Sequence, residues 1–292
     1  MRITNLMQLT DALASQSRAS QQVYDLTNQA TTGLKINAPS DDPAGYASVV
    51  TSDAQISVLQ ARSKAISNAA GDLNLADGAL SSAGDLMMKA KQLAITAADG
   101  SQSASDRAAA GAQINQIAQQ LIGLANTQGA SGYIFGGTKT DTPPFDAAGN
   151  FTGNAGVTQL EVANGVFTTS NASGANAFTA AGGRDVVGDL KNLATALSSN
   201  NVAAVQSSIA NIDAGSNQLI AARADAGVAA STLQSSGDMI SSALTSVQTS
   251  VANVSNADIP TVYSELTQAQ TSYESAISVN KQLLAMFQAT SH

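Results

Sequence analysis

Few side chains in this sequence are suited to catalysis. The chain contains no cysteine and a single histidine, His292, at the last position. The lack of cysteine excludes thiol catalysis, disulfide scaffolds and cysteine-rich zinc sites. We expect neither a Ser-His-Asp triad nor a multi-histidine metal site, because one terminal histidine is poorly placed to act as a general base.

Two local motifs could bind ligands, but each has a simpler interpretation. The neighbouring carboxylates of Asp41 and Asp42 could hold a cation or transfer protons, yet they precede Pro43 and are typical of a turn and helix cap. Residues 132–140, Gly-Tyr-Ile-Phe-Gly-Gly-Thr-Lys-Thr, come close to a phosphate-binding P-loop. However, Lys139 falls one residue late, and no strand-then-helix pattern surrounds it. We therefore interpret this segment as a turn-rich loop.

A catalytic centre in the central region would depend on a few titratable residues. Residues 129–183 contain Lys139, Asp141, Asp146 and Glu161, but no histidine or cysteine. This is a weak basis for an active site, so we expect no enzymatic activity and no cofactor. An enzyme is kept as an alternative hypothesis, which loss of turnover on substitution of Asp146 or Glu161 would support.

Composition narrows the class of partners. There are 13 Lys and Arg residues against 21 Asp and Glu, a net charge of -8, and no basic stripe, so we do not expect nucleic-acid binding. No run of about 18 apolar residues exists to span a membrane, and the N-terminus lacks the apolar core of a secretory signal peptide.

Hydrophobic residues make up 43% of the chain but aromatic residues only 4%. Small aliphatic side chains of this kind suit thin seams between helices.

Most of the chain has the apolar spacing of long helices. In residues 212–256 an apolar residue recurs every seven positions, which predicts a coiled-coil helix that packs into an internal core. Residues 53–98 form a second such run, interrupted by polar residues such as Asp77, and shorter helices are predicted over 106–127 and 185–198. The heptad residues of the first run are Leu219, Ala226, Leu233, Ile240, Val247 and Val254.

The central region has a different pattern. Residues 129–183 are rich in Gly, Asn and Thr, and alternating apolar residues predict strands over 157–162 and 166–169, joined by a turn at 163–165. We predict a small β insertion here. The phenylalanines expected to supply most of its core are Phe151, Phe167 and Phe178.

Both ends of the chain are predicted to be amphipathic helices that become ordered on association. Apolar residues recur there at spacings of three and four, but residues 15–22 are polar, so the N-terminal helix alone buries too little surface to offset chain entropy. Asn280 lies within the C-terminal stripe and is either a register-setting polar residue of a seam or a residue beside its surface. The predicted assembly interface consists of Ile3, Leu6, Leu9, Leu13, Val262, Leu266, Tyr273, Ile277, Leu284 and Phe287.

The segment after the N-terminal helix has the features of a structured joint. Gly33 can end the preceding helix, and Asp42 can cap the next one with Pro43 at its first position. The predicted interdomain joint residues are Gly33, Pro39, Asp41, Asp42 and Pro43.

These elements predict a mainly α fold, a long antiparallel helical or coiled-coil rod with paired terminal helices and a small β insertion domain. We expect three domains. Residues 1–40 and 260–292 form a terminal-helix domain, residues 41–128 and 184–259 form a helical rod domain, and residues 129–183 form the insertion.

Several segments resemble the bacterial flagellin superfamily. Residues 33–45, Gly-Leu-Lys-Ile-Asn-Ala-Pro-Ser-Asp-Asp-Pro-Ala-Gly, are similar to the N-terminal signature of the family, and residues 1–4 fit its start. Residues 133–145, 190–197 and 221–227 are similar to the branch of the superfamily that joins the flagellar hook to the filament. The resemblance covers nearly the whole chain.

The resemblance implies a structural protein of the bacterial flagellum that self-assembles as a ring or short helical layer at the hook–filament junction. The implied partners are further copies of the chain, a neighbouring hook-associated protein, flagellin and an export chaperone. The implied location is extracellular, reached by secretion through the flagellar type III channel in an unfolded state. Two alternatives are kept: filament flagellin itself, and a secreted coiled-coil effector or adhesin.

Overall fold

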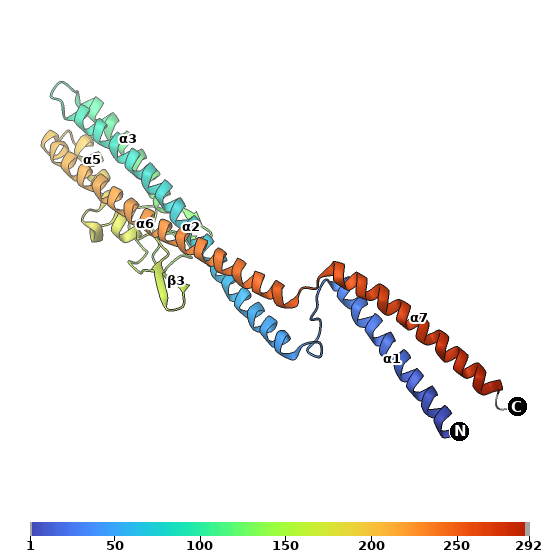
Figure 1. Ribbon diagram of the computed structural model, residues 1–292. Coiled ribbons are helices and arrows are strands. Elements are labelled where there is room, and N and C mark those ends of the chain that lie inside the picture. The colour runs from blue at the N-terminus through green and yellow to red at the C-terminus, as the bar shows by residue number, and fades with distance from the viewer. Residues whose placement is uncertain (1, 290–292) are drawn as a thin grey trace. The chain divides into compact units, whose positions relative to one another are not determined.

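The computed structural model describes residues 2–289 of the chain, without the side chains of residues 2–6, 287 and 289. The described part is mainly helical, which confirms the predicted fold class (Figure 1). The helices are α1 Arg2–Thr32, α2 Pro43–Ala98, α3 Ala104–Ala125, α4 Gly174–Phe178, α5 Val186–Ser198, α6 Val202–Ser255 and α7 Ile259–Ala289. The strands are β1 Gln128–Gly129, β2 Gly132–Tyr133, β3 Gln159–Ala163 and β4 Val166–Thr169, and a 3-10 turn spans Ala180–Gly182.

The chain forms two compact units. The terminal unit comprises residues 1–58 and 243–292, and the bundle unit comprises residues 59–242. The long helices α2 and α6 each contribute to both units. None of the helices in the described part of the chain contains a stretch long and apolar enough to cross a bilayer.

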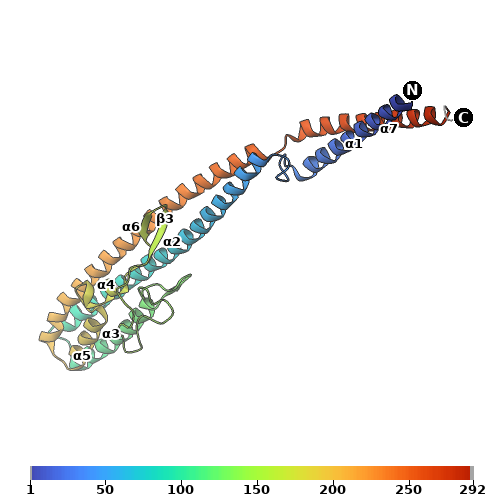
Figure 2. The same cartoon turned by 90° about the horizontal axis from the view of Figure 1, so that it is seen from below.

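The bundle unit is built on α2 and α6, which run side by side in opposite directions (Figures 1 and 2). The heptad row predicted in α6 is buried at Leu219, Ala226, Leu233 and Ile240. In α2, a row of three large residues that ends in an alanine alternates with a row of alanines, and such alternation lets facing side chains interdigitate. These rows are Leu73, Leu80, Met87 and Ala94, and Ala76, Ala83, Ala90 and Ala97.

Polar residues that interrupt the α2 seam lie at its edges. Asp77 pairs with Arg223 of α6, with 2.8 Å between Oδ1 and Nε, and Lys91 pairs with Asp213 of α6 at 2.6 Å. Both pairs are partly exposed, so we attribute to each well under about 1 kcal/mol of stability. Their main consequence is to favour one antiparallel register of α2 against α6.

Two shorter helices complete the core of the bundle unit. Helix α3 buries Ile114, Ile117 and Leu121, and α5 buries Leu190, Leu193 and Leu197, as the predicted helices over 106–127 and 185–198 require. The start of α3 carries a capping box between Ser103 and Asp106.

The β insertion lies against the bundle unit and contains two small hairpins. β1 pairs with β2, and β3 pairs with β4 across a turn in which Gly165 has φ +74°. Residues 132–140 comprise strand β2 and the turns that follow it, and the N–H of Tyr133 donates to the carbonyl of Thr140. This is not the strand–loop–helix arrangement of a P-loop. Asp72 of α2 anchors the first hairpin by accepting hydrogen bonds from the N–H groups of Ala130 and Ser131.

The aromatic core of the insertion differs from the prediction at one position. Phe178 is buried as expected, but Phe167 is 58% exposed and Phe151 only half-buried. The other buried rings are Phe135 and Phe145, whose centroids lie 5.2 and 5.8 Å from that of Phe178. Phe167 was wrongly placed in the core because it lies on a two-stranded hairpin, where one face of alternating side chains meets solvent.

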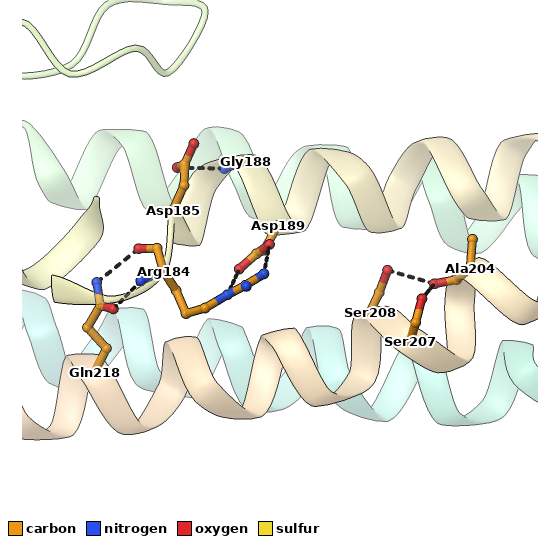
Figure 3. A network of polar contacts seen from close by, with 8 residues as sticks. All are labelled: Arg184, Asp185, Gly188, Asp189, Ala204, Ser207, Ser208 and Gln218. Atoms are coloured by element: carbon orange, nitrogen blue, oxygen red, sulfur yellow. Dashed lines mark hydrogen bonds and ion pairs between the residues drawn. The ribbon is translucent and has the colours of Figure 1, made fainter. Parts of the chain in front are cut away.

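A buried glutamine connects the insertion to the bundle. The Nε2 of Gln218 on α6 donates to the carbonyls of Ala177, Thr179 and Arg184. Its Oε1 accepts from the N–H of Arg184 at 2.7 Å, and Figure 3 shows both contacts between Gln218 and Arg184. Arg184 then forms a two-point ion pair with Asp189 of α5. One side chain of α6 thereby holds the chain segment that runs from α4 into α5.

Candidate functional site: the terminal helix pair and its joint

Helices α1 and α7 pack against each other in an antiparallel pair. Their buried cluster consists of Leu26, Val262 and Ala269, with Val23 and Leu266 packed beside it. On α1 the half-buried and buried residues follow the three-and-four spacing of a coiled-coil seam. This row is Leu9, Ala12, Gln16, Ala19, Val23, Leu26 and Ala30.

The structure brings only some of the predicted interface residues into this seam. Val262 is buried at 5% exposure, and Leu9, Leu266, Tyr273 and Ile277 are half-buried. Leu13 and Leu284 are exposed, at 50% and 47%. The side chains of Ile3, Leu6 and Phe287 lie outside the described part of the structure.

Sequence reasoning missed Leu26 as the best-buried residue of α1. The signal was present, because Leu26 continues the row that begins at Leu9. It was overlooked because the row also contains Gln16 and alanines, so its middle looked polar.

The pair also exposes apolar side chains outside its seam. Large hydrophobic residues on α1 and α7 are between 47% and 65% exposed. Exposed apolar side chains on a helix pair are available to pack against another molecule. These residues are Met7, Leu13, Tyr24, Tyr263, Val279, Leu284 and Met286.

The joint begins with a left-handed glycine that ends α1. Gly33 has φ +73°, and its N–H donates to the carbonyl of Gln29 at 2.9 Å. The following residues pair with the α6–α7 connection: the N–H of Lys35 donates to Ser255, and the N–H of Ala257 donates to Gly33. The ends of α1 and α6 and the start of α7 are therefore linked through the backbone.

The two aspartates of the joint have separate structural roles. Oδ2 of Asp41 accepts hydrogen bonds from the N–H groups of Asn37 and Ala38, both at 2.9 Å. These backbone hydrogen bonds, led by that of Asn37, lower the pKa of Asp41. Oδ1 of Asp42 accepts from the N–H groups of Ala44 and Gly45, which caps α2 as expected.

The remaining joint residues complete the turn into α2. Pro43 is the first residue of α2, and Pro39 is exposed. Gly45 is buried between Asp42 and Ile36: a β-carbon there would lie 2.5 Å from Oδ2 of Asp42 and 2.6 Å from Cδ1 of Ile36. The joint is thus closely packed around Gly45 and Ile36, and elsewhere it is held by hydrogen bonds.

Three of the four titratable residues named for the insertion, Lys139, Asp146 and Glu161, are engaged in separate local contacts. Glu161 of β3 pairs with Arg62 of α2 at 3.1 Å. Asp146 accepts from the side chain and the N–H of Asn150, both at 2.8 Å, and these hydrogen bonds lower the pKa of its carboxyl. Lys139 donates to the carbonyl of Thr152 at 3.5 Å. Each of these groups stabilises a turn or a helix contact.

Comparison with known proteins supports the flagellar resemblance. Residues 3–140 match the bacterial flagellin N-terminal helical region. The chain is 34% identical over 163 residues to flagellar hook-associated protein 3 of Salmonella typhimurium, covering 54% of this chain and 51% of that protein. It is 36% identical over 130 residues to flagellar hook-associated protein 3 of Escherichia coli, covering 44% of this chain and 41% of that protein. The matches thus span about half or less of the length of these relatives.

A solved structure shows the same fold. A flagellar hook-associated protein of Vibrio parahaemolyticus superposes with a TM-score of 0.67 at 22% identity, over 74% of this chain and all of that chain. Together these matches confirm the resemblance to the bacterial flagellin superfamily that the motifs at 33–45 and 133–145 indicated.

Proposed function

We propose that this chain, whose residues 3–140 match the bacterial flagellin N-terminal helical region, is a structural protein that joins the flagellar hook to the filament. It assembles as a ring or short helical layer through α1 and α7. The predicted interface residues, including Leu13 and Leu284, contact neighbouring copies in the layer. The names of the relatives from Salmonella typhimurium and Escherichia coli support a hook-associated part over other flagellar parts.

One observation carries the assembly role: the apolar side chains that the α1–α7 pair leaves outside its own seam. Leu13 and Leu284 are about half exposed, and Met7 and Met286 more so. Burying the remainder of such a side chain contributes roughly 1 kcal/mol. Seven residues of this kind supply on the order of 5–10 kcal/mol per copy, before the entropy of association is subtracted.

The joint and the bundle unit support the same role. Within the terminal unit, backbone hydrogen bonds link the ends of α1 and α6 to the start of α7, and Asp41 holds the turn at Asn37 and Ala38. We further propose three domains with the boundaries given above, and a mechanical function without catalysis. A chain without cysteine is not cross-linked by disulfides, which suits secretion in an unfolded state through the flagellar type III channel.

The proposed partners follow from the position in the assembly. A neighbouring hook-associated protein lies on one side of the layer and flagellin on the other, and the extracellular flagellum is the location. An export chaperone covers the exposed apolar surface of α7 before secretion.

The test is a charge placed on the exposed apolar surface. Leu13→Asp and Leu284→Asp should leave the bundle unit folded and abolish incorporation into the hook–filament junction, measured by filament attachment in a strain that lacks its own copy. Met239→Asp is the matched control, because Met239 is 65% exposed but lies on α6 in the bundle unit. Normal filament attachment by both terminal variants would refute the assembly role of the pair.

Filament flagellin is the second candidate, favoured by the match of residues 3–140. Deletion of the gene separates the two functions. Loss of a junction protein leaves hooks without filaments and releases flagellin into the medium. Loss of a filament subunit leaves hooks and no flagellin to release.

A further inference from the structure

Asn280 is a buried amide in the middle of the apolar seam between α1 and α7. It is 4% exposed, which excludes the surface position that the sequence left open. Its Nδ2 donates to the carbonyl of Ala12 at 3.3 Å and to Oε1 of Gln16. The side-chain amides of Gln16 on α1 and Asn280 on α7 therefore contact each other across the seam.

The orientation of the Asn280 amide is determined by its neighbours. The Ala12 carbonyl only accepts hydrogen bonds, so the nitrogen of the amide must face it. Oδ1 is then left buried without a hydrogen-bond partner among the described residues. An unpaired buried acceptor is destabilising, so Asn280 needs an explanation other than stability.

Part of the seam carries small side chains, which select a register less strongly than large interlocking ones. These residues are Ala12, Ala19 and Ala30 on α1 and Ala269 and Ala276 on α7. A shift of seven residues towards the C-terminal end of α1 separates Asn280 from Gln16 and places it opposite the apolar residues Ala19 and Val23. The joint that links Gly33 to Ala257 holds the register at one end of the pair, and the amide pair favours the same register towards the other end.

We propose that Asn280 and Gln16 form a register-selecting contact that positions α7 against α1 and so aligns the exposed apolar residues of both helices for assembly. The inference rests on the proposed role of the α1–α7 pair. Asn280 acts as a positioning residue, and the stability lost to its unpaired Oδ1 is the cost of that specificity.

The test measures register and stability separately in the full chain. The natural sequence has no cysteine, so two spin labels attach only at the introduced residues Gln8→Cys and Gln268→Cys, both at exposed positions. These sites are staggered along the pair, and a slip of one heptad changes their axial separation by about 10 Å. Pulsed electron paramagnetic resonance then reports each register as a separate distance.

The informative variant is the double substitution Gln16→Leu with Asn280→Leu. We expect a second distance displaced by about 10 Å from the first, together with an unchanged or higher melting midpoint of the terminal helices. The exchanged pair Gln16→Asn with Asn280→Gln retains two amides and should restore one distance. Tyr273→Phe alters a different half-buried seam residue and should not change the distance.

Several outcomes overturn the inference. One is a single, unshifted distance in the leucine variant, whatever its melting midpoint, because the amides would then have no role in register. Another is a second distance already present in the natural sequence. Failure of the proposed function gives a different result. If the natural chain shows one spin-label distance but does not restore filament attachment in the strain that lacks its own copy, the junction role is refuted and the register contact is not.

Discussion

Leu26 provides a quantitative test of how the terminal unit is held together. It is 6% exposed, in a cluster whose other buried members are Val262 and Ala269. Leu26→Ala removes the equivalent of about three methylene groups, worth roughly 2.4 kcal/mol of transfer free energy. The cavity adds to this, so we expect a loss of about 2–4 kcal/mol from the stability of the α1–α7 pair.

The assay is amide hydrogen exchange followed by mass spectrometry. A loss of about 2–4 kcal/mol accelerates exchange in α1 and α7 by roughly 30-fold to 1000-fold. Peptides from α5, whose core lies in the bundle unit, should exchange at the natural rate. Local opening of the pair is expected because only a few side chains are fully buried in it.

The matched control is Leu13→Ala, which makes the same chemical change at a residue that is 50% exposed. It should cost at most about 1 kcal/mol, because half of that side chain already contacts solvent. Equal acceleration by the two substitutions would refute the assignment of Leu26, and not Leu13, to the seam. If Leu26→Ala accelerated amide exchange equally in α5 and α1, the two units would not open independently.

Further predictions concern the joint and the bundle. Asp42→Ala removes the cap of α2 and should destabilise the start of that helix by about 1 kcal/mol, measured by exchange of the first-turn amides. Gly45→Ala should cost more than a helical Gly→Ala change elsewhere, because its β-carbon meets Asp42 and Ile36; a thermal midpoint at or above that of the natural chain would contradict this packing. The pKa of Asp41 is lowered, so its contribution to the joint is fully present above its ordinary pKa of about 3.9 and is lost as pH falls through the lower folded value. Acid titration followed by NMR of the Asn37 and Ala38 amides should show this loss only below about pH 3.9, and Asp41→Asn should show no such transition. Gln218→Met leaves several backbone groups without their partner and should lower the stability of the bundle unit by about 2–4 kcal/mol in chemical denaturation.

Much of the helical architecture follows from local sequence. The start of α2 at Pro43 after Asp42 and the end of α1 at Gly33 depend on residues within four positions, so capping rules were sufficient to predict them. The heptad repeat of α6 could likewise be predicted, since Leu219, Ala226 and Leu233 recur every seven residues, the period of a coiled coil. Periodicity and caps act along one chain segment and need no knowledge of its neighbours.

Tertiary structure decided which of several apolar faces is covered. Leu13 and Leu26 are equally hydrophobic, but only the partner helix α7 determines that Leu26 enters the seam and Leu13 remains half exposed. Phe135 and Phe167 also differ in burial. Phe135 lies in the core, whereas Phe167 lies on the face of the β3–β4 hairpin that meets solvent. The burial of Asn280 opposite Gln16 could not be deduced from either helix alone, since a polar residue within an apolar stripe is buried only when the facing helix supplies its hydrogen bond. Local sequence thus determined where the elements begin and end, whereas the choice of contact surface depended on pairings between residues more than 250 positions apart, such as Ala12 and Asn280.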